Sequence, residues 1–283
     1  MELGRIGVWI GRALPEPEYG AAAELAEDLG FGTLWLGASP RLPVLRPMLD
    51  ATDSIVIATG IVNVWQYDPA ELAAEFAALD AEYPGRVLLG IGIGHSEATQ
   101  EYTKPLTKTR EFLDGIATSA DPVPRERMVL AALGPKMLDL SYEYTLGTHP
   151  YFTPPEHTRF ARERLGADAL VAPEQAVVID TGDSEAAEAA ARTYAARYLG
   201  LSNYTNNLRR FGYTDEGLAD GGTKAVIDEM VPQGTAEHVA PAVLAHLDAG
   251  ADHVCVQAVG ASGLPRVEWT ALSEVLIESG AEL

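Results

Sequence analysis

The stretch Val87–Ile93 reads VLLGIGI, an apolar run in which glycine comes to alternate with isoleucine. A short run of this kind predicts a strand. The residues before it predict a helix that starts around Pro69, with an apolar stripe at helical spacing made by Leu72, Phe76, Leu79 and Tyr83. The run Ile55–Val64, IVIATGIVNV, predicts a strand before that helix. Strand, helix and strand in this order indicate a βαβ unit and therefore a parallel sheet.

The same alternation runs through the whole chain of 283 residues. Eight strands are predicted, at Gly4–Ile10, Thr33–Gly37, Ile55–Val64, Val87–Ile93, Met128–Leu133, Gly147–Tyr151, Ala176–Asp180 and His253–Ala258. Further helices are predicted between Pro17 and Gly30, from Gly134, and at Pro155–Leu165, Ser184–Leu199, Thr235–Ala249 and Arg266–Ser279. A (β/α)8 barrel typically needs about 250 residues. We therefore predict an α/β fold, a (β/α)8 TIM barrel that forms a single domain over residues 1–283.

Two segments exceed the bare repeat, residues 96–127 after the fourth strand and residues 200–231 after the seventh. The second carries asparagine, glycine and aromatic residues, beginning LSNYTNNLRRFGYTDEGLADGG. Long connections in a compact domain are usually lids, binding loops or interface elements. Both are predicted as insertions at the same end of the barrel.

Composition excludes several classes of function. The formal net charge of −21 argues against binding to nucleic acid, because such a surface repels phosphates. No segment has the roughly 18 uncharged apolar residues of a membrane span, and the N-terminus lacks a signal-peptide pattern. The single cysteine, Cys255, lies in an apolar strand and suits a reducing compartment. These features predict a cytoplasmic protein whose partner is a small molecule.

The active sites of (β/α)8 barrels lie at the C-terminal ends of the strands. There the glycines of Gly90–Gly94 leave one face of the fourth strand without side chains, which favours either a flat ligand against it or close packing of a neighbour. His95 follows directly and could transfer a proton near neutral pH, or be a solvated loop residue. His149 ends the sixth strand, whereas His238 and His246 are predicted on a helix surface and His253 as structural. No metal-ligand spacing is present, so no metal is predicted.

Two further groups of residues are candidates at this end. Gly134-Pro135-Lys136 opens a helix, and free amides at a helix start with a nearby lysine can bind an anion, although the pattern also suits an ordinary helix start. Aromatic residues at strand ends predict an apolar wall, and they are Trp9, Trp65, Tyr67 and Tyr151.

Motifs in the order of the barrel carry a resemblance to a known family. They are Glu24–Phe31 with Leu34–Leu36, Ala58–Asn63, Arg86–Gly94, Leu130–Met137 and Asp248–Val254, together with Gly147–Tyr151 and Leu201–Leu208. Over nearly its whole length the chain resembles the luciferase-like monooxygenase superfamily, especially the branch that uses the deazaflavin coenzyme F420. The combination is similar to a subgroup common in actinobacteria. The resemblance implies a bacterial-luciferase-like barrel.

The resemblance also implies roles for individual residues. A bulge with a non-prolyl cis peptide would fall at Gly60-Ile61 beside Asn63, and the deazaflavin ring would lie along Gly92–Gly94. The phosphate would contact the segment Leu133, Gly134, Pro135 and Lys136 and the loop that holds His149 and Tyr151. We predict Trp9, Ser39 and Trp65 as substrate-binding residues. The sugar-phosphate dehydrogenases of the family have an acid–histidine pair where this chain has Ala38-Ser39, and a glutamate where it has His95, which argues against sugar-phosphate oxidation. His95 is the predicted catalytic residue.

The predicted function is therefore an F420-dependent oxidoreductase that transfers a hydride to or from a small, apolar carbonyl, enone or alcohol. The alternatives are an FMN-dependent monooxygenase on the same fold, or a barrel that binds a cofactor without turnover. The resemblance also implies a homodimer, for which the stripe Leu72, Phe76 and Leu79 offers a surface, unless that stripe only packs on the barrel.

Overall fold

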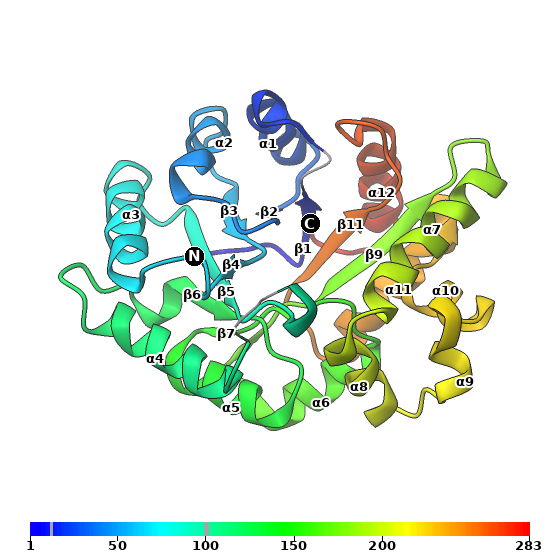
Figure 1. Cartoon of the computed structure of the whole chain (residues 1–283). Helices are drawn as coiled ribbons and strands as arrows, with labels where there is room; N and C mark the ends of the chain where they lie inside the picture. The colour runs from blue at the N-terminus through cyan, green and yellow to red at the C-terminus, as the bar shows by residue number, and fades with distance from the viewer. Residues whose placement is uncertain (12–13, 99–101) are drawn as a thin grey trace.

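A closed barrel of parallel strands forms the centre of the molecule (Figure 1), in a computed structural model that describes residues 1–11, 14–98 and 102–283. The strands on the continuous path around it are β1 (Ile6–Ile10), β2 (Thr33–Leu36), β3 (Val56–Thr59), β5 (Val87–Gly92), β6 (Met128–Leu130) and β7 (Gly147–Thr148). The path ends with β8 (Leu170–Val171) on β7, and at its other end β9 (Glu174–Ile179) pairs with β11 (Val254–Ala258), which pairs with β1. Because β8 and β9 are consecutive pieces of one strand, the barrel closes between them. The predicted (β/α)8 fold is confirmed.

The seventh barrel strand starts earlier than the sequence predicted, at Leu170 rather than Ala176. Pro173 lies between its two pieces and has no N–H to donate, which accounts for the break in the ladder. Its carbonyl still accepts the N–H of Cys255 at 2.9 Å, so the two pieces are linked to the same neighbour. The short strand β10 (Gln233–Gly234) was not predicted and adds to β9.

The third strand was predicted as one run, Ile55–Val64, but is two pieces. After β3, the chain bends at Gly60-Ile61 and resumes as β4 (Val62–Asn63), which pairs with β5. The fifth and sixth strands of the barrel, labelled β6 and β7, are shorter than predicted and end at Leu130 and Thr148. Beyond β7 the hydrogen bonds continue irregularly, since the N–H of Glu174 donates to the carbonyl of Pro150 at 2.8 Å.

Helices surround the barrel and cover the outer face of its strands (Figure 1). Those between successive strands are α1 (Tyr19–Asp28), α2 (Arg46–Asp50), α3 (Pro69–Glu82), α4 (Pro105–Ala117), α5 (Pro135–Tyr144), α6 (Pro155–Leu165), α7 (Ser184–Leu199), α11 (Ala236–Asp248) and the C-terminal α12 (Arg266–Glu278). Short 3₁₀ helices are η1 (Glu16–Glu18), η2 (Leu42–Leu45), η3 (Ser96–Ala98), η4 (Arg125–Arg127) and η5 (Ala219–Gly221). Pro17 therefore lies in η1 and not in α1.

The insertion after the seventh strand is helical, with α8 (Ser202–Arg210), α9 (Asp215–Leu218) and α10 (Lys224–Met230) gathered beside α7 (Figure 1). Its apolar residues form a core of their own with α7, including Leu199, Leu208, Ile227 and Met230. The insertion is therefore packed structure rather than a loose loop. It holds α8 close to the ends of the strands.

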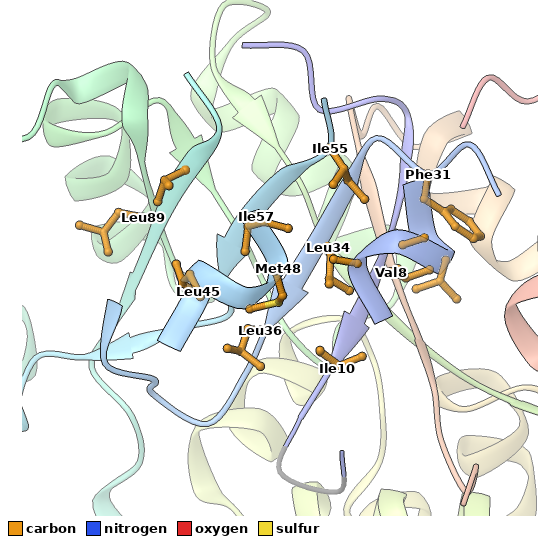
Figure 2. Close-up of a cluster of buried hydrophobic side chains, with 14 of the residues drawn as sticks. Val8, Ile10, Phe31, Leu34, Leu36, Leu45, Met48, Ile55, Ile57 and Leu89 are labelled. Carbon is orange, nitrogen blue, oxygen red and sulfur yellow. The ribbon is translucent and has the colours of Figure 1, made fainter. Parts of the chain in front are cut away.

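The main core lies between the strands and the surrounding helices. Figure 2 shows part of it, where Leu34, Leu36 and Ile57 of neighbouring strands meet Leu45 and Met48. Alternate residues along a strand point to opposite faces, so this shell and the barrel interior are filled by different residues. The interior set contains Trp35, Ala58, Leu88, Val129 and Cys255.

Three expectations about the surface need revision or stay open. Leu72, Phe76 and Leu79 of α3 are buried in the main core, so this stripe packs on the barrel and offers no dimer surface. The homodimer itself stays a prediction. His246 is buried and not on the surface as predicted, with its ring hydrogen-bonded to Thr158 Oγ1 and Gln175 Oε1.

Within the described residues, no helix combines the length and apolar character required to cross a membrane.

Gly90 provides a test of how the barrel is packed. A Cβ atom on Gly90 would lie 1.9 Å from the backbone oxygen of Thr59. We expect Gly90→Ala to lower the free energy of unfolding by about 1 to 3 kcal/mol, since two barrel strands would have to move apart. Urea unfolding followed by circular dichroism measures it. In the matched control, Gly200→Ala, the new Cβ meets only ordinary contacts at 3.4 Å, and an equal loss there would contradict this account.

Candidate active site

A cavity of about 750 Å³ opens at the C-terminal ends of the barrel strands. This volume falls within the range of about 300 to 1,000 Å³ that is usual for small-molecule sites. Its wall combines residues at the ends of strands from both halves of the barrel with side chains from α7 and α8. The structure thus places the cavity where barrel enzymes carry their active sites.

Most of the residues predicted from the sequence meet in this wall. They are Trp9, Ser39, Gly60, Ile61, Asn63, Gly92, Gly94, His95, Leu133, Gly134, His149 and Tyr151. Their common origin is the end of a strand, so their meeting follows from the barrel. Whether each of them binds a ligand stays a prediction.

The exceptions are Pro135, Lys136 and Trp65, which do not line the cavity. The side chain of Lys136 is exposed to solvent. Trp65 turns away to donate its Nε1–H to the carbonyl of Ile93 at 2.8 Å, and Lys108 Nζ lies 5.5 Å from its ring centroid. Trp65 therefore fastens the chain after β5 and does not contact the cavity.

The Gly60-Ile61 peptide bond is cis, as predicted. Ile61 lies against the glycines of β5, because a Cβ on Gly92 would lie 2.7 Å from Ile61 Cγ1. Asn63 fills the space beside Gly94 in the same way, with its Nδ2 2.6 Å from the position of a Cβ. Close packing by the bulge therefore accounts for these glycines, yet Gly92 and Gly94 also line the cavity. The packing interpretation of the glycine strand is confirmed, and the flat ligand against it stays a prediction.

Two buried nitrogens beside Gly60 lack hydrogen-bond partners. Trp9 Nε1 and His149 Nε2 lie 2.6 and 3.4 Å from the position of a Cβ on Gly60, and neither has a partner within the described residues. His149 stacks on Trp35 with 4.0 Å between ring centroids, and its Nδ1–H donates to the carbonyl of Ala172 at 2.7 Å. Because Nδ1 carries the proton, Nε2 is an acceptor. The wall thus presents one donor and one acceptor close together.

His95 is half-buried at the mouth of β5 and is held by α8. Its Nδ1 lies 3.2 Å from Asn203 Oδ1, an oxygen that can only accept, so Nδ1 carries the proton. Burial lowers the pKa of His95, while the contact with Asn203 partly opposes that shift. The neutral ring leaves Nε2 as the nitrogen available to a ligand. This arrangement favours a base over a proton donor.

Several cavity residues lie on segments that the sequence indicated but were not singled out as candidates. α7 contributes Tyr194, Arg197 and Tyr198, α8 contributes Asn203 and Tyr204, and β11 contributes Gln257. Spacings of three and four residues place the α7 side chains on one face of that helix. A polar and aromatic face on an otherwise alanine-rich helix was the signal that could have found them.

The tyrosines form a hydrogen-bonded cluster over a buried carboxyl. Tyr151 Oη lies 2.7 Å from Tyr194 Oη, 3.0 Å from Tyr198 Oη and 2.7 Å from Gln257 Oε1. Tyr194 Oη in turn lies 3.2 Å from Glu174 Oε1. Glu174 is 1% exposed, and burial raises its pKa to about 8. The carboxyl is therefore neutral at pH 7.

Two arginines supply positive charge near the cavity of this acidic protein. Arg197 lines the cavity, and Arg210 of α8 places Nη1 3.3 Å from the position of a Cβ on Gly134, at the start of α5. Neither guanidinium has a carboxylate partner in the part of the chain that is described. In the same part, no group of three or more His, Cys, Asp or Glu side chains is arranged to hold a metal ion. The cation that lies beside Gly134 is Arg210, and a contact of Lys136 with a ligand stays a prediction.

Fold and cavity together define a (β/α)8 barrel with a cavity of small-molecule size at the C-terminal ends of its strands. The sequence model for luciferase-like monooxygenases matches residues 3–253, and the chain belongs to this family. A Mycobacterium tuberculosis protein named as a coenzyme F420-dependent oxidoreductase is 26% identical, over 82% of this chain and 86% of its own. The 5,10-methylenetetrahydromethanopterin reductase of Archaeoglobus fulgidus is 24% identical over 74% of this chain and 78% of its own.

Solved structures show the same fold at low sequence identity. An F420-dependent secondary alcohol dehydrogenase in complex with an F420-acetone adduct has a TM-score of 0.75 and 18% identity, and the match covers 97% of this chain and 98% of the other. A type II Baeyer-Villiger monooxygenase from Pseudomonas putida, in complex with FMN, has a TM-score of 0.67 and 14% identity over 99% and 98% of the two chains. The chain is thus an enzyme of a family that contains deazaflavin and flavin oxidoreductases.

Acidification should destabilise the fold through His149. Burial lowers its pKa to about 4, against about 6.5 unfolded, so the unfolded state binds more protons below pH 6.5. The stability that the neutral ring contributes is complete above pH 6.5 and is lost as the pH falls toward 4. We expect His149 to account for a loss of about 2 kcal/mol between pH 7 and pH 5. Urea unfolding at both values should show a flatter dependence in His149→Gln, whereas the exposed His238→Gln should keep the full slope.

Proposed function

We propose that the protein is an F420-dependent oxidoreductase that transfers a hydride between the deazaflavin and a small apolar alcohol or its carbonyl product. The observation that carries the proposal is the wall made by the Gly60-Ile61 bulge and the glycines of β5, with two unpartnered ring nitrogens beside it. The names of the relatives from M. tuberculosis and A. fulgidus support the oxidoreductase class. When bound, the deazaflavin would supply or accept the hydride.

The residues present fit a flat heterocycle with polar edges. Ile61 and Asn63, which occupy the space that side chains at Gly92 and Gly94 would fill, would back its face. Trp9 Nε1–H could donate to a ring carbonyl, and His149 Nε2 could accept a ring N–H. Buried polar atoms are nearly always paired, and a bound ring would pair both.

The other end of the coenzyme needs a site for its phosphate. The start of α5 has a free N–H at Lys136 and a positive helix end, and Arg210 lies beside Gly134. These groups would hold the phosphate against the repulsion of a protein with a net charge of −21. Binding would then depend on short-range contacts, and the polyglutamate tail would add little.

His95 would handle the proton at the substrate oxygen. As an alcohol is oxidised, its hydride leaves from carbon and Nε2 of His95 takes the hydroxyl proton. In the reverse direction the protonated ring returns that proton to the oxygen of the reduced carbonyl. Asn203 holds the ring in the tautomer that leaves Nε2 free. The apolar surroundings, Leu14, Met137 and Pro265 among them, favour a substrate without charge.

Coenzyme preference tests the proposal directly. Fluorescence titration of the purified protein at low salt should give a Kd for F420 at least about tenfold below that for FMN, a difference of about 1.4 kcal/mol. Tighter binding of FMN, with oxygen consumption once FMN is reduced, would instead support the monooxygenase alternative. Binding of either without turnover on any alcohol or carbonyl would support a barrel that only binds its cofactor.

Replacement of His95 separates catalysis from binding. We expect His95→Gln to lower kcat by at least about tenfold and to leave the affinity for F420 nearly unchanged, because the ring acts on the substrate proton. The exposed His238→Gln serves as the control and should match the wild type. A loss of F420 affinity with normal kcat at saturation would mean that His95 anchors the coenzyme. If neither changes, His95 has no role in the reaction.

A further inference from the structure

The hydrogen atoms of the tyrosine cluster can be counted, and the count favours a protonated Glu174. The cluster has five contacts among the oxygens of Tyr151, Tyr194, Tyr198, Gln257 and Glu174. Three phenols supply three hydrogens, and the amide oxygen of Gln257 supplies none. As a carboxylate, Glu174 accepts the O–H of Tyr194. A protonated Glu174 adds a fourth hydrogen, which it can donate to Tyr194 instead. The acid form therefore satisfies the cluster better than the carboxylate does.

The surroundings of Glu174 disfavour its charge. It lies on β9 in register with Cys255 of β11, and residues in register project from the same face, here into the barrel interior. No lysine or arginine pairs with it within the described residues; its other contact is the N–H of Phe152, 3.2 Å from Oε2. A buried carboxylate without a cation is costly, so the proton stays on Glu174.

A protonated Glu174 also sets the direction of the chain. It donates to Tyr194, Tyr194 then donates to Gln257 or Tyr151, and Tyr151 donates to Gln257. Gln257 and Tyr151 then accept hydrogens from within the cluster and do not need the one on Tyr198. Tyr198 can therefore turn its O–H toward the cavity that it lines. If Glu174 were ionised, Tyr194 would donate its O–H to Glu174, and a negative charge would lie two hydrogen bonds away from the cavity wall. That charge would repel a negatively charged ligand oxygen at the phenols.

We propose that Tyr198, backed by Tyr151, forms a subsite for a phenolate- or enolate-type oxygen of a flat apolar ligand, with the protonated Glu174 leaving the hydroxyl of Tyr198 free to donate to it. Arg197 lines the same part of the cavity, with its guanidinium carbon 5.7 Å from the ring centroid of Tyr198, and adds positive charge. Tyr204 separates the subsite from His95, at 5.5 Å from the ring of Tyr198 and 5.3 Å from that of His95. The subsite shares the cavity of the proposed function but needs no coenzyme.

Between pH 6.5 and 9.5, Glu174 is the facing group expected to change charge. Burial raises the pKa of Tyr151, Tyr194 and Tyr204 well above the ordinary value, and it does the same for the Cys255 thiol. Tyr198 shifts in the same direction, and the pKa of His95 is lowered. Arg197 is the charged side chain that lines the cavity beside them.

The test uses pentafluorophenolate, an aromatic anion that stays ionised at both pH values, and the full-length protein without coenzyme. The wild type should bind it about tenfold more tightly at pH 6.5 than at pH 9.5 by isothermal titration. Glu174→Gln should bind tightly at both, because the amide N–H donates to Tyr194 as the acid does. Tyr198→Phe should lose most of the affinity at pH 6.5, and the exposed Tyr142→Phe should behave as the wild type.

Two results would overturn the proposal. If Glu174→Gln keeps the wild-type dependence on pH, Glu174 does not control the phenols; if Tyr198→Phe binds normally, the subsite is elsewhere. Infrared difference spectra between the two pH values give a second readout, in which the wild type should lose one carboxylic acid band that Glu174→Gln never shows. An unchanged wild-type spectrum would also count against it. Neither measurement involves F420, so failure here leaves the proposed function untouched, and the reverse also holds.

Discussion

The contact between Thr59 and Gly90 is the constraint on which the site depends. Thr59 Oγ1 donates to the carbonyl of Gly90 at 2.9 Å and accepts its N–H at 2.8 Å. Only a residue without a side chain allows β3 to approach β5 so closely, because a Cβ on Gly90 would meet the Thr59 oxygen. The approach directs the following residues across β5, so that Ile61 and Asn63 take the space that side chains at Gly92 and Gly94 would fill. The flat wall of the cavity is the result.

A second constraint is that the interior is kept neutral while the surface is acidic. His149, His157, His246 and His253 are all buried, and burial lowers each pKa to about 3 or 4, so all four rings are neutral at pH 7. The pKa of Glu174 is raised rather than lowered, and this side chain is neutral as well, because burial disfavours the charged form of acids and bases alike. The positive charge near the cavity comes from Arg197 and Arg210, which belong to α7 and α8. The positive charge that would attract an anion therefore comes from the helices α7 and α8 and not from the barrel strands.

The sequence was sufficient for the barrel and for one wall of the cavity. Apolar runs separated by helical stripes predict the order of the strands, and the order places Trp9, Gly92 and His149 at one end. It was insufficient where the direction in which a side chain points, rather than its place in the sequence, decides whether the residue reaches the cavity. Lys136 and Arg210 are both cations near the start of α5, but only the packing of α8 brings Arg210 to Gly134. Trp65 stands at a strand end like Trp9, yet the carbonyl of Ile93 draws its ring out of the cavity.

The cavity has two walls of different origin, and this difference separates what each can determine. The backbone wall of Gly60-Ile61 and β5 comes from the barrel itself and offers a flat face with few side chains, which suits a ring common to many reactions. The second wall, with Tyr194, Tyr198, Asn203 and Tyr204, comes from α7 and the insertion behind it, held by the separate core of Leu199, Leu208 and Ile227. Loops and insertions on a rigid scaffold can change without loss of the fold. The choice of ligand in this protein therefore rests with the segment 184–231, and substitutions there should alter what is bound before they alter whether the barrel folds.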